Sequence, residues 1–194
     1  MKILIDNGHG ENTPGKHSPD GRLQEWAYTR EIADIVVFGL RKHGIDAERI
    51  VKENIDVPLS ERCNRANNIY RETRKNAILV SIHCNAAGNG SQWMNARGWE
   101  AWTSVGQTKA DALAEHLYKA AEETGLKTRK DMTDGDVDKE GHLYILKHTK
   151  CPAVLTENFF QDNKEDVEYL LSSEGKRTVA NIHVEGIINY LNSK

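Results

Sequence analysis

The 194-residue sequence has no paired-cysteine motif, no long apolar run and no excess of basic charge. Its three cysteines, at positions 63, 84 and 151, form no CxxC pair, which argues against a disulfide framework and against a cysteine-rich zinc finger. A membrane helix needs about 20 consecutive apolar residues. The longest candidate, Ile35 to Leu40, is far shorter and contains Gly39. We therefore expect no membrane span.

Further absences bear on location, partners and organisation. The first apolar segment meets Asp6 after three apolar residues, whereas the core of a signal peptide runs for about 7 to 15. We therefore expect a chain made without a signal peptide, or one whose leader has been trimmed. The formal charge is −3 with mixed signs, so we expect no nucleic-acid partner. The absence of repeats and of linker-like tracts predicts a single domain over residues 1–194, and we expect a monomer.

Apolar strands alternate with amphipathic helices along the chain. The pattern predicts strands at 2–5, 45–51, 77–83, 99–103 and 153–156, and helices at 25–43, from Pro58 onward, at 108–124 and at 176–191. This alternation predicts an α/β fold, in which helices cover both faces of a mostly parallel sheet. The polar segment 126–141 is expected to be a long loop that borders a site.

Histidine is abundant, with eight residues, and two of them lie where predicted strands end. His9 lies in a Gly-His-Gly turn after the first strand, and His83 ends the buried strand 77–83. Glu25 opens the first predicted helix. Because the ends of parallel strands gather at one edge of a sheet, these side chains are expected to meet. Two imidazoles and one carboxylate are a ligand set for a catalytic zinc, which keeps a fourth position open, so we expect one zinc ion per chain.

Each of these features has another interpretation when it is taken alone. A Gly-His-Gly turn before a helix is also typical of a phosphate-binding loop, although the usual Lys-Ser/Thr is missing here. Glu25 is also placed as a first-turn acid that interacts with the helix dipole. His83 is also consistent with a buried histidine that binds no metal. Its neighbour Cys84 faces the opposite side of the strand and is expected in the core. Glu157, after the strand 153–156, suits either a base for a metal-activated water or a half-exposed acid in a turn.

Taken together, the motifs resemble those of the zinc-dependent N-acetylmuramoyl-L-alanine amidases, which cut peptidoglycan. The matching segments follow the family's order over nearly the full chain: 5–10, Glu25, 59–62 with 66–67, 81–86, 97–98, and 152–157 with Phe160 and Asn163. The resemblance implies that His9, Glu25 and His83 bind Zn²⁺ and that Glu157 is the catalytic acid and base. It also implies a twisted, mostly parallel sheet of about six strands.

The sequence departs from the family pattern at two positions. Asn7 stands where proline is common, and Phe159 stands where glycine usually follows the glutamate, a change that bears on the shape of the adjoining cleft. The family's inhibitory helix is a long insertion, but only about a dozen residues separate Asn85 from Arg97, so we expect no such helix here.

Several other residues are candidates for contact with the substrate. Asn85 follows the second histidine motif, and Glu140 and His142 end the polar segment 126–141. Four aromatic residues offer flat faces for stacking, although we expect most of them in the core: Trp93, Trp99, Trp102 and Tyr144.

The resemblance implies hydrolysis of the amide between N-acetylmuramic acid and L-alanine, in wall lysis or remodelling by an endolysin or autolysin. A zinc carboxypeptidase acting on stem peptides has the same ligand set, but it normally needs an arginine for the terminal carboxylate, and the matched motifs contain only Arg62 and Arg97. A non-enzymatic module that binds the wall is the third possibility. The expected setting is a phage lysin that waits in the cytoplasm for a pore, or a trimmed domain of an exported amidase.

Overall fold

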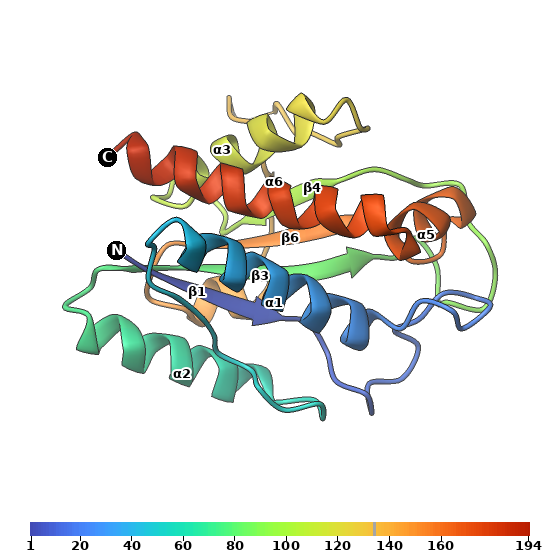
Figure 1. The fold of residues 1–194 in the computed structure, drawn as a ribbon, viewed down its shortest axis with the longest axis horizontal. Coiled ribbons are helices and arrows are strands. Elements are labelled where there is room, and N and C mark those ends of the chain that lie inside the picture. Colours follow the sequence, from blue (N-terminus) through green and yellow to red (C-terminus); the bar gives the residue numbers. More distant parts are fainter. Residues whose placement is uncertain (134) are drawn as a thin grey trace.

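A six-stranded sheet lies at the centre of the protein, with helices on both of its faces (Figure 1). The computed structural model describes residues 1–133 and 135–194. Its elements, in chain order, are β1 (Lys2–Asn7), α1 (Glu25–Lys42), β2 (Ala47–Arg49), α2 (Leu59–Glu72), β3 (Ala77–Asn85), β4 (Glu100–Thr103), α3 (Asp111–Glu123), β5 (Lys139–Glu140), α4 (Tyr144–His148), β6 (Ala153–Phe160), α5 (Lys164–Leu171) and α6 (Ser173–Asn192).

The strand order is β2-β1-β3-β6-β4-β5. β1 pairs in parallel with β2 and β3, β3 with β6, and β4 with β5, whereas β4 and β6 pair in antiparallel fashion. The predicted mostly parallel sheet is therefore confirmed. Among the described helices, none is both long and apolar enough to cross a membrane.

The alternation of side chains along the strands divides the core into two layers. Ile3 and Ile5 of β1 belong to the larger apolar cluster, which includes buried residues of α1, α3 and α6. Leu4, between them, faces the smaller cluster with Leu79 and buried residues of α2 and α4. Because both faces of β1 and β3 are buried, their sequences are almost continuously apolar.

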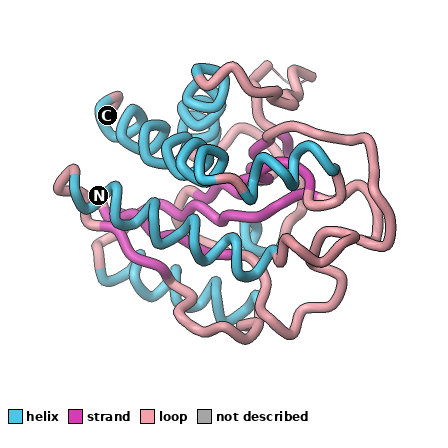
Figure 2. The backbone as a smooth tube through the Cα atoms, turned by 45° about the vertical axis from the view of Figure 1, so that its right-hand side comes forward, coloured by secondary structure: helices cyan, strands magenta, loops and turns pink. Residues whose placement is uncertain are grey.

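The carboxyl ends of β1, β3 and β6 lie at one edge of the sheet because these strands are parallel. In Figure 1 this edge is on the right, and both chain termini lie on the left. Figure 2 shows that long loops gather at the same edge. Loops at the carboxyl ends of parallel strands are the usual place for a site in an open α/β sheet.

Several elements differ from the sequence prediction. β6 continues to Phe160, so Glu157 lies within the strand and not after it. The segment 126–141 is not all loop, since it contains β5 and a bridge between Thr128 and Trp99; residue 134 is outside the described residues. The short helices α4 and α5 had no clear apolar period to reveal them.

Phe159 occupies a bulge in β6. The register with β3 shifts after the His83–Glu157 pair, and Phe159 has a φ of 64°, in the left-handed region that favours glycine. Its side chain is buried in the larger core cluster, with its ring 5.8 Å from that of Tyr169. The backbone here suits the family's usual glycine, and the bulky phenyl group of this chain packs into the core.

We expect Phe159→Gly to be more stable than Phe159→Ala, although alanine is the better residue in most contexts. Both variants lose a buried phenyl group, at a cost of about 3 to 5 kcal/mol. Only alanine also retains the left-handed strain, which costs roughly 1 kcal/mol. Denaturant titration of both proteins measures the difference in free energy of unfolding. An alanine variant at least as stable as the glycine variant contradicts this explanation of the bulge.

Candidate metal centre

Three side chains from separate segments converge at the carboxyl edge of the sheet. One potential ligand atom from each of His9, Glu25 and His83 lies within 4.8 Å of the others. Glu25 Oε1 is 3.6 Å from Nε2 of His9 and 3.3 Å from Nδ1 of His83. The two imidazole rings meet edge to face, with their centroids 5.0 Å apart. The structure therefore brings together the three residues that the sequence analysis selected.

The glycines beside His9 make room for close approaches. A Cβ on Gly8 would lie 2.4 Å from the ring of His83, and a Cβ on Gly10 would lie 1.9 Å from the backbone nitrogen of Asp56. The left-handed conformation in this turn belongs to His9 itself, with a φ of 58°. The glycines therefore remove two steric clashes, and the left-handed turn is made by the histidine between them.

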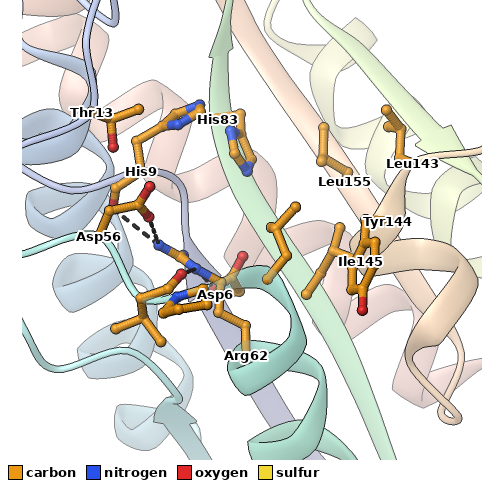
Figure 3. A pocket seen from close by; sticks show the side chains of 13 residues that line it. Asp6, His9, Thr13, Asp56, Arg62, His83, Leu143, Tyr144, Ile145 and Leu155 are labelled. Carbon is orange, nitrogen blue, oxygen red and sulfur yellow. Dashed lines mark hydrogen bonds and ion pairs between the residues drawn. The ribbon is translucent and has the colours of Figure 1, made fainter.

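Two arginines hold the strained turn in place, and Figure 3 shows one of them, Arg62. Nη1 of the buried Arg62 donates hydrogen bonds to Asp6 Oδ1 at 2.9 Å and to the carbonyl oxygen of Asn7 at 2.6 Å. The carbonyl oxygen of His9 accepts from Nη2 of Arg62 at 3.1 Å and from Nη2 of Arg30 at 3.0 Å. These charge-assisted bonds fix the backbone of His9 and thereby the direction of its ring.

The protonation states of His9 and Glu25 favour metal binding. Burial lowers the pKa of His9 to about 4, so its ring is neutral at pH 7. Burial opposes ionisation of Glu25, but the hydrogen bond with His83 and the charges of both imidazoles outweigh it and lower the pKa of Glu25. For His83, burial works against the charged form, and the hydrogen bond and charge of Glu25 outweigh it and raise its pKa. The cluster thus pairs an ionised carboxylate with two imidazoles.

The donor set fits a divalent cation. Glu25 Oε1 accepts a hydrogen bond from the backbone nitrogen of Cys84 at 2.9 Å. Glu25 Oε2 is buried and has no hydrogen-bond partner among the described residues. A buried carboxylate oxygen without a partner is costly. A cation bound between Glu25 and the two imidazoles removes that cost, and two histidines with one glutamate are a common set for catalytic zinc.

Glu157 lies beside this group on β6, in register with His83 on β3 and with Glu100 on β4. Neighbouring strands are about 4.8 Å apart, so its carboxyl group is close to the three ligands. Burial is the main cause that raises the pKa of Glu157 to about 8. Its Oε2 is buried without a hydrogen-bond partner in residues 1–133 and 135–194. An acid with these properties is suited to exchange protons near neutral pH.

A cavity of about 390 Å³ adjoins His9 and His83. Figure 3 shows His9 and Arg62 on one side of it and Leu155 and Tyr144 on the other. Much of its lining is apolar and consists of Val57, Pro58, Leu59, Leu143, Tyr144, Ile145 and Leu155. Such a cavity beside polar groups is typical of a substrate site.

The other candidate substrate contacts are dispersed. Asn85 lies near the centre and donates from Nδ2 to Glu100 Oε1 at 2.8 Å. Glu140 is in the edge strand β5, where it accepts a hydrogen bond from the backbone nitrogen of Gly106. His142 is exposed, one residue before Leu143 in the cavity wall.

The four candidate aromatic residues have different environments. Trp99 is fully buried, and Trp102 is half-buried against the smaller core cluster. Trp93 and Tyr144 are exposed, at 37% and 42%. Only Tyr144 of these four is in the cavity wall, so it is the aromatic residue best placed to contact a substrate.

Glu100 was not among the predicted site residues, although it is buried and lies opposite Glu157. Its Oε2 accepts a hydrogen bond from Nε of Arg129 at 2.6 Å. The available signal was an acid inside the apolar segment 99–103, because a buried carboxylate requires partners.

The chain is similar in sequence and in fold to known cell-wall amidases. The model of a family described as N-acetylmuramoyl-L-alanine amidase matches residues 3–189. The chain is 27% identical to the endolysin of Bacillus phage SPP1, over 99% of this chain and 66% of that protein. It is 30% identical to the N-acetylmuramoyl-L-alanine amidase CwlM of Bacillus licheniformis, over 99% of this chain and 69% of that protein. The chain thus spans about two thirds of the length of these relatives. A solved N-acetylmuramoyl-L-alanine amidase from Clostridium difficile 630 has a TM-score of 0.84 and 25% identity, and the match covers 100% of this chain and 98% of that one.

Proposed function

Because the chain belongs to the N-acetylmuramoyl-L-alanine amidase family, we propose that it hydrolyses the amide between N-acetylmuramic acid and L-alanine with the help of one zinc ion. His9, Glu25 and His83 would hold the ion. The observation that carries the proposal is this ligand group together with Glu157, the register partner of His83, whose buried carboxyl oxygen has no partner among the described residues.

The zinc ion and Glu157 would have different roles in the reaction. A zinc ion held here supplies Lewis acidity toward the amide carbonyl and lowers the pKa of water. Glu157 accepts a proton as water attacks the carbonyl carbon. It then donates this proton to the alanine nitrogen, so that the C–N bond breaks and a neutral amine leaves. The raised pKa of Glu157 suits both transfers, because a group that titrates near neutral pH is able to take up and release a proton.

Arg62 and Arg30 support this chemistry because they hold the backbone of the ligand His9 in place. Their shared acceptor is the carbonyl oxygen of His9, so they position the imidazole through its backbone. The apolar cavity beside His9 and His83 is placed to receive a group next to the scissile amide.

The carboxypeptidase alternative lacks an available arginine in the matched motifs. Arg62 is only 1% exposed, and its three nitrogens already donate to protein acceptors. Arg97 forms ion pairs with Glu165 and Asp166. Neither guanidinium is free to bind a terminal carboxylate in this geometry, so the two motif arginines give the carboxypeptidase alternative no support.

We place the action of the enzyme at the cell wall, as a lysin or a wall-remodelling autolysin, with peptidoglycan as its macromolecular partner. The support is the amidase family and the similarity to a phage endolysin and to a bacterial amidase.

Digestion of purified sacculi tests the proposal. We expect the release of intact stem peptides with a new N-terminal alanine, and about one zinc ion per chain in the purified protein. Removal of the metal by a chelator should stop the release, and added zinc should restore it. The release of single amino acids would instead indicate a carboxypeptidase, and binding to sacculi without release at any metal concentration would indicate a wall-binding module.

A further inference from the structure

A buried carboxylate, Glu100, lies next to Glu157 on the same face of the sheet, and two cations, Arg129 and Lys139, lie beside it. Glu100 is directly opposite Glu157 in the antiparallel pair of β4 and β6, so the two side chains share one face of the sheet. Trp102, two residues further along β4, lies on the same face opposite Leu155. Lys139 of β5 is the register partner of Trp102. The proposed zinc site, Glu157, Glu100 and Lys139 therefore follow one another across the strands.

Both carboxylate oxygens of Glu100 have hydrogen-bond donors or cations beside them. Its Oε1 accepts from Asn85 Nδ2 at 2.8 Å and from Trp102 Nε1 at 3.0 Å. Its Oε2 accepts from Arg129 Nε at 2.6 Å and lies 3.9 Å from Lys139 Nζ. The buried carboxylate therefore has two cations beside a single oxygen, which is more positive charge than its own neutralisation requires.

Arg129 is the better placed of the two cations to bind another anion. Lys139 also acts on the exposed carboxylate of Asp131, whose pKa is lowered mainly by hydrogen bonds from Thr133. Arg129 uses Nε for Glu100, and its two Nη nitrogens have no hydrogen-bond partner among the described residues. Its side chain is 36% exposed, so solvent reaches part of it.

The Arg129 guanidinium is also held in a fixed orientation. Its backbone nitrogen donates to the carbonyl oxygen of Trp99 at 2.8 Å, and its carbonyl oxygen accepts from the Tyr118 hydroxyl at 2.9 Å. The guanidinium carbon lies 5.1 Å from the centroid of the Phe160 ring. A guanidinium with its Nε anchored and its Nη edge free is arranged for a two-pronged bond to a carboxylate.

We propose that Arg129 binds a carboxylate of the peptide part of the substrate, two to three residues from the scissile amide. This inference rests on the proposed function. β3 and β4 are separated by two strand spacings, roughly 10 Å, and an extended peptide covers about 3.5 Å per residue. The apolar cavity beside His9 and His83 reaches Leu155 of β6, on the sheet face that also carries Glu157 and Glu100, so a stem peptide that leaves the ligand group across β6 and β4 stays on this face.

Three matched disaccharide tripeptides test the proposal. The first has free carboxylates at its second and third residues, and the other two carry a carboxamide at one of these positions. With the zinc-loaded wild-type chain, we expect one of the amidated substrates to show a KM about tenfold higher than the first, with kcat within about twofold. In Arg129→Gln, all three substrates should share the higher KM, and Arg129→Lys should fall between because it keeps the charge and loses the planar fork. The preference should also weaken as ionic strength rises.

Lys119→Gln is the matched control, because it removes one exposed positive charge on α3. This variant should keep the wild-type preference. A wild-type preference that survives in Arg129→Gln would overturn the role of Arg129, and equal KM values for all three substrates in the wild type would overturn carboxylate recognition. Failure of the wild-type chain to cleave any of the three would overturn the proposed function itself.

Discussion

Replacing Glu157 by glutamine is expected to lower kcat on muropeptides by about 10³-fold and to leave zinc binding intact. Glutamine has nearly the shape of a protonated glutamate but does not accept a proton from water. The three proposed ligands lie on other segments and keep their mutual geometry. Turnover measured by release of N-terminal alanine, together with the zinc content of the same preparation, checks both parts of the expectation. Turnover above about one tenth of the wild-type value would remove Glu157 from its role as base.

The stability of the same variant provides an internal control. In the metal-free chain, burial raises the pKa of Glu157 to about 8 from a usual value of 4.5. The folded state therefore binds more protons than the unfolded state between these two pH values, and the contribution of Glu157 to stability falls as pH rises through this window. Glutamine does not titrate. Relative to the wild type, we expect metal-free Glu157→Gln to gain stability from pH 5 to pH 8, as measured by denaturant unfolding at each pH.

The ligand group could be predicted from sequence because its evidence is local. His9 follows an apolar strand, Glu25 begins a helix with a clear apolar period, and His83 belongs to a β-branched strand. Each position is fixed relative to its own element, and the parallel arrangement of the strands then brings the ends together at one edge. The fold class followed from the same alternation of strands and helices.

The wall of the site beyond Glu157 could not be predicted in this way. The pairing of Glu100 with Glu157 depends on β4 running antiparallel to β6, and the contact of Arg129 with Glu100 depends on a bridge at the start of segment 126–141. Both are long-range contacts, and no periodicity of a single segment encodes them. The bulge at Phe159 was likewise hidden, because a large aromatic residue is not expected at a positive φ.

The bulge also explains why β6 was predicted too short. Regular alternation ends where Glu157 and Asn158 introduce polar side chains, although the backbone pairing with β3 resumes at the Asn85–Phe160 pair. Asn158 is buried and fully engaged, with its amide nitrogen donating to the carbonyl oxygen of His83 at 2.9 Å and its amide oxygen accepting from Trp99. In a sequence, a polar residue of this kind indicates the end of a strand, although here its side chain is buried and hydrogen-bonded within the strand.

Loss of one ligand should have the largest effect on the metal. A four-ligand zinc site contributes roughly 10 to 16 kcal/mol, or roughly 2.5 to 4 kcal/mol per ligand, so the loss of one corresponds to about 10²- to 10³-fold weaker binding. Glu25→Gln is the sharpest variant, because it preserves the shape of the side chain and its ability to accept from the Cys84 nitrogen while it removes the negative charge. We expect this variant to lose its zinc on dialysis and to show no turnover above that of the chelator-treated wild type.

Glu31→Gln is the matched control for this experiment, since it makes the same chemical change at an exposed position on the same helix. Zinc that binds only the folded chain raises its melting temperature. The wild type and Glu31→Gln should therefore gain thermal stability when zinc is added, and Glu25→Gln should gain little. The charge of Glu25 is central to this expectation, because its Oε1 lies between the two imidazoles and its Oε2 has no other partner among the described residues. A Glu25→Gln protein that retains one zinc ion per chain and the full zinc-dependent rise in melting temperature would show that the ion binds elsewhere.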